Sequence, residues 1–152
     1  MRKICCFAGH KEIYCEENLF NEIKEAAEKL IVEEKVNEFW FGNYGYFDAV
    51  SASAVRELKG VYHDIEINLI IPYVTAEINE YKEVYYKKYD NILIAEIPEK
   101  TSRQFKILKC NQYMVKNSDF LICYVKNSWG GAYKNLEYAK KQNIKIINLA
   151  DN

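Results

Sequence analysis

The sequence has no apolar run approaching the roughly 20 residues that a helix needs to cross a bilayer. Its opening stretch, MRKICCFAGH, carries too short an apolar segment for a signal peptide and is typical of a first buried strand. We therefore expect a cytoplasmic protein that has no membrane partner.

Metal-binding patterns are also scarce. No C-x-x-C occurs, and the two histidines, His10 and His63, are too far apart to suggest a zinc box. The five cysteines are odd in number, include the adjacent pair Cys5 and Cys6, and lie in apolar runs. That arrangement favours reduced, buried thiols over a disulfide framework. The sequence predicts neither a metal site nor a cofactor.

An excess of positive charge is missing too. The chain has 21 Lys and Arg against 22 Asp and Glu, which gives a net charge of -1. Proteins that bind duplex nucleic acid usually present a basic face, so a nucleic-acid partner is not expected. What is present is ordinary for a globular protein: 152 residues, of which 49% are hydrophobic and 28% charged. These values predict one domain over residues 1–152.

Short apolar runs alternate with longer amphipathic segments along the chain. The apolar runs lack polar alternation, which is typical of strands buried on both faces of a parallel sheet. The pattern predicts an α/β fold, a single doubly wound, mostly parallel Rossmann-like sheet flanked by helices. The predicted strands are Ile4–Ala8, Phe39–Phe41, Ile67–Ile71, Ile92–Ala95, Phe120–Val125 and Ile144–Leu149, and the predicted helices are about Asn18–Lys35, Asp48–Lys59, Ile78–Lys88, Thr101–Asn117 (with Thr101 as N-cap) and Ala132–Gln142.

In open α/β sheets, ligands bind beyond the carboxyl ends of the strands, near the point where the strand order reverses. The pair Gly130 and Gly131 follows a predicted strand and leads into a helix. Glycines permit close approach of a ligand, and the free N–H groups of a helix start attract an anion such as phosphate. A plain strand-to-helix turn explains the pair equally well. Neither a Walker A sequence nor G-x-G-x-x-G is present.

Other polar residues follow the first two predicted strands. Gly42 and Gly45 form a tight turn, and Asp48 stands at the start of the next helix. Asp48 has two interpretations: a cap for the helix, or a carboxylate that binds ribose hydroxyls or acts as an acid or base. A neutral His10 could bind a phosphate oxygen or a base edge. Four tyrosines fall beside this predicted pocket, where a ring could stack on a base: Tyr44, Tyr46, Tyr73 and Tyr133.

Four segments carry a further pattern: CCFAGH at 5–10, FGNYGYFD at 41–48, NQYMVKNSD at 111–119, and GGA at 130–132 followed by EYAK at 137–140. In this order they resemble the YpsA-like branch of the SLOG superfamily, across essentially the whole chain. The resemblance implies a Rossmann-like fold that binds nucleotide-derived ligands, including ADP-ribose types. With the loops above, it predicts ligand contacts at Gly9, His10, Lys11, Gly42, Gly45, Asp48, Asn111, Met114, Gly130, Gly131, Ala132 and Tyr133.

The superfamily also includes DprA and the "lonely guy" phosphoribohydrolases, which cleave a base from a nucleoside monophosphate. The hydrolase motifs are R-K-x-x-M and P-G-G-x-G-T-x-x-E. Met114 and Glu137 match them, but Cys110 replaces the arginine and Tyr133-Lys134 replace Gly-Thr. A thiol cannot hold a phosphate or developing charge as a guanidinium does. Asp48 and Glu137 are the catalytic candidates if the protein is an enzyme.

The leading hypothesis is a protein that binds a nucleotide-derived small molecule of ADP-ribose type, to sense or sequester it without turnover. One alternative is a nucleoside-monophosphate N-glycosidase. Another is a DprA-like accessory protein that binds nucleic acid. Many relatives pair through helices, so the resemblance also implies a homo-oligomer.

Overall fold

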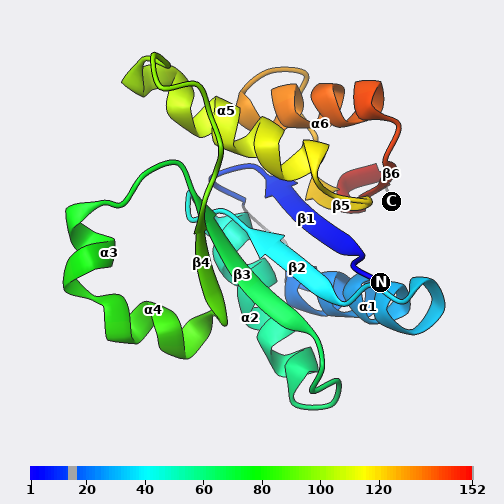
Figure 1. Cartoon of the computed structure of the whole chain (residues 1–152). Coiled ribbons are helices and arrows are strands. Elements are labelled where there is room, and N and C mark those ends of the chain that lie inside the picture. Colours follow the sequence, from blue (N-terminus) through cyan, green and yellow to red (C-terminus); the bar gives the residue numbers. More distant parts are fainter. Residues whose placement is uncertain (14–16, 152) are drawn as a thin grey trace.

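The computed structural model describes residues 1–13 and 17–151, and its centre is a six-stranded sheet (Figure 1). The strand order is β4-β3-β2-β1-β5-β6, and every neighbouring pair is parallel. The strands are β1 (Ile4–Gly9), β2 (Glu38–Phe41), β3 (Glu66–Ile71), β4 (Asn91–Ile94), β5 (Phe120–Tyr124) and β6 (Lys145–Asn148). The predicted α/β fold with a doubly wound parallel sheet is confirmed.

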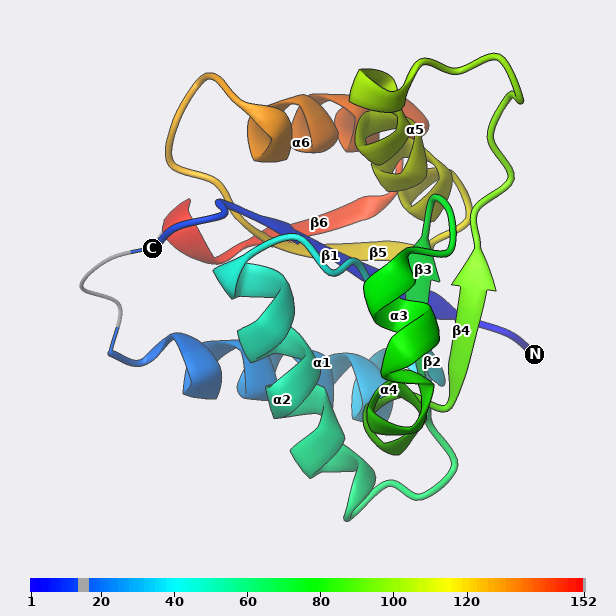
Figure 2. The same ribbon diagram turned by 90° about the vertical axis from the view of Figure 1, so that its left-hand side faces the viewer.

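Helices cover the two faces of the sheet as separate layers (Figure 2). α1 and α2 pack below it in this view, and α5 and α6 pack above it. The helices are α1 (Leu19–Glu34), α2 (Tyr46–Lys59), α3 (Ala76–Glu80), α4 (Lys82–Lys88), α5 (Arg103–Lys116) and α6 (Gly131–Gln142), followed by the 3-10 turn η1 (Leu149–Asp151).

The unbroken apolar runs of the strands supply two cores. On β1, Cys5 and Phe7 point into the core shared with α1 and α2, whereas Cys6 and Ala8 point toward α5 and α6. Successive strand residues face opposite sides, so a strand with a helix layer on each face needs apolar residues at every position. The central strand β1 is buried from Ile4 to Ala8 for this reason.

The structure differs from two of the sequence predictions. The single helix expected at Ile78–Lys88 is two helices, α3 and α4, which meet at Tyr81 (φ −107°, ψ 34°). None of the residues of α4 is buried, so no apolar stripe continues from one helix to the other. The predicted N-cap Thr101 is also wrong: its N–H donates to the carbonyl of Pro98 in a turn (3.0 Å), and the N-cap position of α5 is Ser102.

Four cysteines are free and buried: Cys5, Cys6, Cys110 and Cys123. Burial raises the pKa of Cys110 to about 12, so its thiol stays protonated and serves as core packing. Cys15 lies outside the described residues. None of the helices within the described ranges is long and apolar enough to cross a membrane.

Candidate functional site

A cleft of about 660 Å³ opens at the carboxyl ends of β1 and β5. In the sheet, β1 has β2 on one side and β5 on the other. The strand order therefore reverses at this point, which is where ligands bind in open α/β sheets. In Figure 2 the loop from β5 to α6, drawn in orange, rises from this end of the sheet. Many of the residues predicted from the sequence line the cleft: Gly9, His10, Lys11, Asp48, Asn111, Gly130, Gly131 and Ala132.

The start of α6 forms one wall of the cleft. Gly130 has a φ of 92°, a conformation that favours glycine. A Cβ on Gly131 would meet no atom within 4 Å beyond its chain neighbours and the backbone of α6. The first backbone bond of the helix runs from the Lys134 N–H to the Gly130 carbonyl (3.1 Å). The N–H groups of Gly131 and Ala132 therefore have no acceptor within the helix. This wall can take an anion.

His10 has a structural role in the loop between β5 and α6. Its Nε2 accepts hydrogen bonds from the backbone N–H groups of Lys126 (2.9 Å) and Asn127 (3.3 Å). Burial and the nearby charge of Lys126 lower the pKa of the imidazole. The ring is therefore neutral at pH 7 with its proton on Nδ1, because Nε2 is the acceptor. His10 can offer a ligand only that one donor.

Asp48 lies on the opposite wall, in the first turn of α2. Its Oδ2 accepts a hydrogen bond from the Tyr44 N–H (3.0 Å). Burial raises the pKa of the carboxyl to about 6, and the bond from Tyr44 opposes the shift. Carboxyl groups whose pKa is raised by burial in a cleft are typical of functional sites. A carboxyl that only capped the helix would stabilise the fold more if it were better hydrated.

We expect Asp48→Asn to stabilise the protein at neutral pH. The folded state holds the proton up to a pH of about 6, against 3.8 for the unfolded chain, so stability falls as pH rises through this interval and is lowest above it. Asparagine keeps an acceptor for Tyr44 without the charge. Urea unfolding at pH 7 should show a gain of about 1–3 kcal/mol, and the gain should shrink at pH 4. An equal difference at both pH values would contradict the assignment to ionisation.

Two predicted glycines lie behind the cleft wall. A Cβ on Gly42 would stand 3.1 Å from Asp48 Oδ2, so Gly42 gives the carboxylate room. Gly45 has a φ of 141°, and a Cβ there would stand 2.8 Å from the Cα of Lys11. The Tyr46 N–H donates to the Lys11 carbonyl at the same point (2.9 Å). Gly45 thus allows the loops after β1 and β2 to meet, whereas Gly42 leaves space for the Asp48 carboxylate.

Five other predicted residues do not line the cleft: Met114, Tyr133 and Glu137, and with them Tyr46 and Tyr73, whose rings were expected beside it. Met114 is 2% exposed and belongs to the core under α5. The Tyr133 hydroxyl donates to Glu137 Oε1 (3.3 Å), and Glu137 Oε2 pairs with Lys140 (3.1 Å). The bond from Lys140 is the main reason that the pKa of Glu137 is lowered. A low pKa and a place outside the cleft do not suit a general acid.

Asn135 was not predicted from the sequence, and Trp129 was not singled out. Asn135 lines the cleft and is only 3% exposed, yet its Oδ1 has no hydrogen-bond partner among the described residues. Trp129 lines the cleft with 69% of its surface exposed, and Tyr44 adds a second ring. The spacing of four residues from Gly131 to Asn135, which puts both on one helix face, was the available signal.

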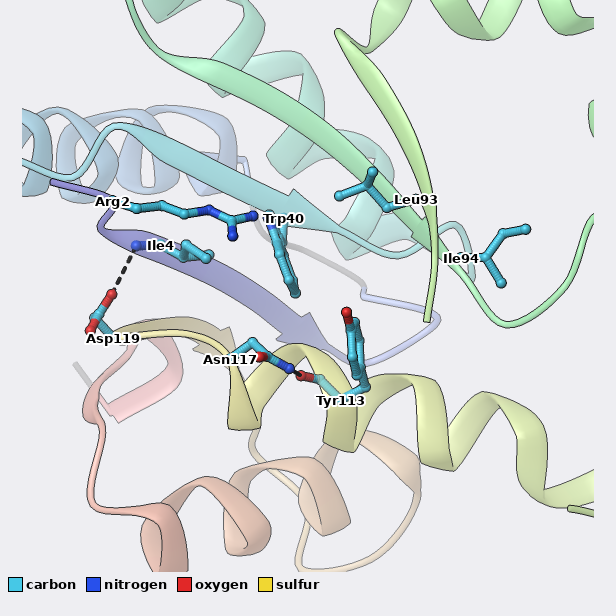
Figure 3. Close-up of a pocket in the computed structure, with 8 residues that line it drawn as sticks. All are labelled: Arg2, Ile4, Trp40, Leu93, Ile94, Tyr113, Asn117 and Asp119. Atoms are coloured by element: carbon cyan, nitrogen blue, oxygen red, sulfur yellow. Dashed lines mark hydrogen bonds between the residues drawn. The ribbon is translucent and has the colours of Figure 1, made fainter. Parts of the chain in front are cut away.

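A second hollow, of about 440 Å³, lies on the face of the sheet that packs against α5, between the last turns of that helix and β4 (Figure 3). Arg2 donates from two nitrogens to Glu38 (2.6 and 2.8 Å), and the Trp40 Nε1–H donates to the same carboxylate (2.7 Å). Asp119 accepts from the Ile4 N–H (2.9 Å), as Figure 3 shows. These polar groups satisfy one another, which favours the cleft over this hollow as the ligand site.

No family model matches this sequence, and neither does any curated protein. Among solved structures, DprA from Streptococcus pneumoniae is similar with a TM-score of 0.63 and 12% identity, over 95% of this chain and 49% of that one. DprA from Helicobacter pylori, described with its single-stranded DNA binding mode, has a TM-score of 0.65 and 13% identity, over 95% of this chain and 63% of that one. The molybdenum cofactor carrier protein of Chlamydomonas reinhardtii has a TM-score of 0.64 and 10% identity, over 99% of this chain and 78% of that one.

These likenesses show a shared Rossmann-like fold of the DprA type. This chain spans about half the length of the Streptococcus pneumoniae DprA chain. Membership of the YpsA-like branch stays a prediction from the sequence motifs.

Proposed function

We propose that the protein binds a nucleotide-derived small molecule of ADP-ribose type in the cleft between β1 and β5, without turnover. The observation that carries this proposal is the uncapped start of α6, which faces the cleft that Asp48 and Tyr44 also line. A phosphate would accept from the N–H groups of Gly131 and Ala132. The volume, about 660 Å³, is in the range of small-molecule sites.

The other parts of such a ligand have partners in the same cleft. Asp48 would accept hydrogen bonds from ribose hydroxyls, and the rings of Tyr44 and Trp129 would stack on a base. Lys11 adds a positive charge to the lining. The phosphate, the sugar and the base of such a ligand would thus each have suitable binding groups in the cleft.

Calorimetry with ADP-ribose, cyclic ADP-ribose, NAD and nucleoside monophosphates tests this proposal. We expect saturable binding of at least one of these ligands, with a Kd on the order of 1–100 μM for a largely preformed site. Folding of the sample is verified by circular dichroism. A folded protein that binds none of the panel would overturn the proposal.

Two alternatives have an observation in their favour. The pKa of Asp48, about 6, suits a general acid in an N-glycosidase. Release of free base from a monophosphate, lost in Asp48→Asn, would identify that enzyme. Its hydrolase-type partner Glu137 lies outside the cleft lining, which is why we favour binding without turnover.

The second alternative is single-stranded nucleic acid, which the Helicobacter pylori DprA binds. Arg103 and Lys106 both face the ring of Tyr73, at 5.9 and 5.0 Å, and Phe105 is 49% exposed beside them. Proteins that bind single-stranded nucleic acid use positively charged side chains to contact the backbone and exposed aromatic rings to stack on the bases. Salt-sensitive binding of an oligonucleotide in a gel shift would support this alternative, and a flat response would remove it.

A further inference from the structure

We propose that Asn135 selects ligands that carry a hydroxyl group close to their phosphate, by accepting a hydrogen bond from that hydroxyl at its buried Oδ1. This inference rests on the proposed function, because it assigns a specificity-determining residue to the same cleft. It goes beyond that proposal by naming the chemical group that separates ligands from close analogues.

The placement of Asn135 carries the inference. The residue lies in α6, one turn after Gly131, and lines the cleft. Side chains on a helix lean toward its N-terminus, so the amide of Asn135 lies over the turn that begins with the free N–H groups of Gly131 and Ala132. An anion bound there and a group bound by Asn135 would be neighbours in one ligand.

The chemistry of the amide defines the missing partner. Oδ1 is buried, and within the described residues it has no donor. Buried polar atoms in native proteins are nearly always hydrogen-bonded, and an amide oxygen can only accept. A ligand that reaches this oxygen would satisfy it by supplying an O–H or N–H. The donor most often found close to a phosphate is a sugar hydroxyl. The class of ligand that fits both groups is therefore a phosphorylated sugar.

Other acceptors in the cleft are differently placed. Asp48 Oδ2 already accepts from the Tyr44 N–H and lies on α2 across the cleft. Asn111, on α5, is only partly buried, so water can reach its amide. A ligand that fails to satisfy Asn135 leaves a desolvated acceptor without a partner, which is the condition under which a site rejects an analogue strongly.

The test compares AMP with 2′,3′-dideoxy-AMP by calorimetry, on the wild-type protein and on Asn135→Leu. We expect the wild-type protein to prefer AMP by at least about tenfold. In Asn135→Leu, binding of AMP should fall at least about tenfold and the preference for AMP should shrink by about the same factor, since only the contact of the hydroxyls with Asp48 would remain. The ligand-free variant should melt at the same temperature or higher, because a buried amide oxygen that has no partner among the described residues is removed. A merely structural asparagine would lower the melting temperature and leave the preference intact.

Ser51→Ala is the matched control. Ser51 is fully buried on α2, its Oγ also has no hydrogen-bond partner in the described chain, and it does not line the cleft. This variant should keep the wild-type preference. Ribose 5-phosphate and inorganic phosphate separate the affinity for the hydroxyl from the affinity for the phosphate. Asn135→Leu should bind ribose 5-phosphate more weakly than the wild-type protein and should bind inorganic phosphate equally well. Asn135→Ala replaces the leucine variant if the latter does not fold.

The outcomes are distinguishable. If the folded wild-type protein binds neither these ligands nor ADP-ribose, cyclic ADP-ribose or NAD, the proposed function fails and the inference fails with it. If it binds AMP and dideoxy-AMP equally, or if Asn135→Leu and Asn135→Ala keep the full wild-type preference, the inference alone is overturned and the cleft remains a binding site.

Discussion

Gly131→Asp is expected to leave the protein folded and to abolish binding of a phosphate-bearing ligand in the cleft. A side chain at this position enters open space, because its Cβ would meet no atom within 4 Å beyond its chain neighbours and the backbone of α6. A carboxylate in the first turn of α6 interacts favourably with the helix N-terminus, by about 0.3–1 kcal/mol. The same carboxylate occupies the N–H groups that a phosphate needs and repels it.

The expected loss of affinity is large. At a separation of about 5 Å and an effective dielectric constant of about 20, two unit charges repel by about 3 kcal/mol, which is roughly 100-fold in Kd. Thermal melting and calorimetry on the same sample measure the two opposite effects. Gly131→Asn is the neutral control of equal size and should lose far less affinity. Equal affinity in the aspartate and asparagine variants would show that no anion binds at the start of α6.

Gly9→Ala is expected to destabilise the fold by about 3 kcal/mol, although it adds a single methyl group. A Cβ at Gly9 would stand 2.2 Å from Cγ of Phe47, and 2.5 and 2.6 Å from two more of its carbons. Phe47 is 1% exposed in the core of α1 and α2 and packs against Phe7. The ring has no room to withdraw, so the backbone of β1 or α2 must shift.

Urea unfolding measures this cost, and Gly131→Ala, in open space, is the matched control with an expected change below about 1 kcal/mol. Pairing Gly9→Ala with Phe47→Leu gives a double-mutant cycle. The two changes should couple, so that the double variant is more stable than the sum of the single effects predicts. Strict additivity would show that the contact between Gly9 and Phe47 is not the cause.

The local pattern of the chain was enough to locate most elements. β1 and β5 consist of consecutive apolar residues, and their observed bounds differ from the predicted ones by a single residue. Burial on both faces leaves such a run little freedom to be anything but a central parallel strand. The stretch around Tyr81 was misjudged because its tyrosines and lysines do not form an apolar stripe, and only contacts with the rest of the fold decide where such a helix breaks.

For the site, the buried runs were enough to show which loops follow the strands, and therefore that Gly9, Asp48 and Gly131 lie at one edge of the sheet. Strands that all pair in parallel end at the same edge. The role of each residue there depends on the folded structure. Gly9 makes room for Phe47, and His10 accepts from the loop before α6. Asn135 is left with a buried oxygen and no partner in the described chain, since distances and burial arise between segments far apart in the sequence.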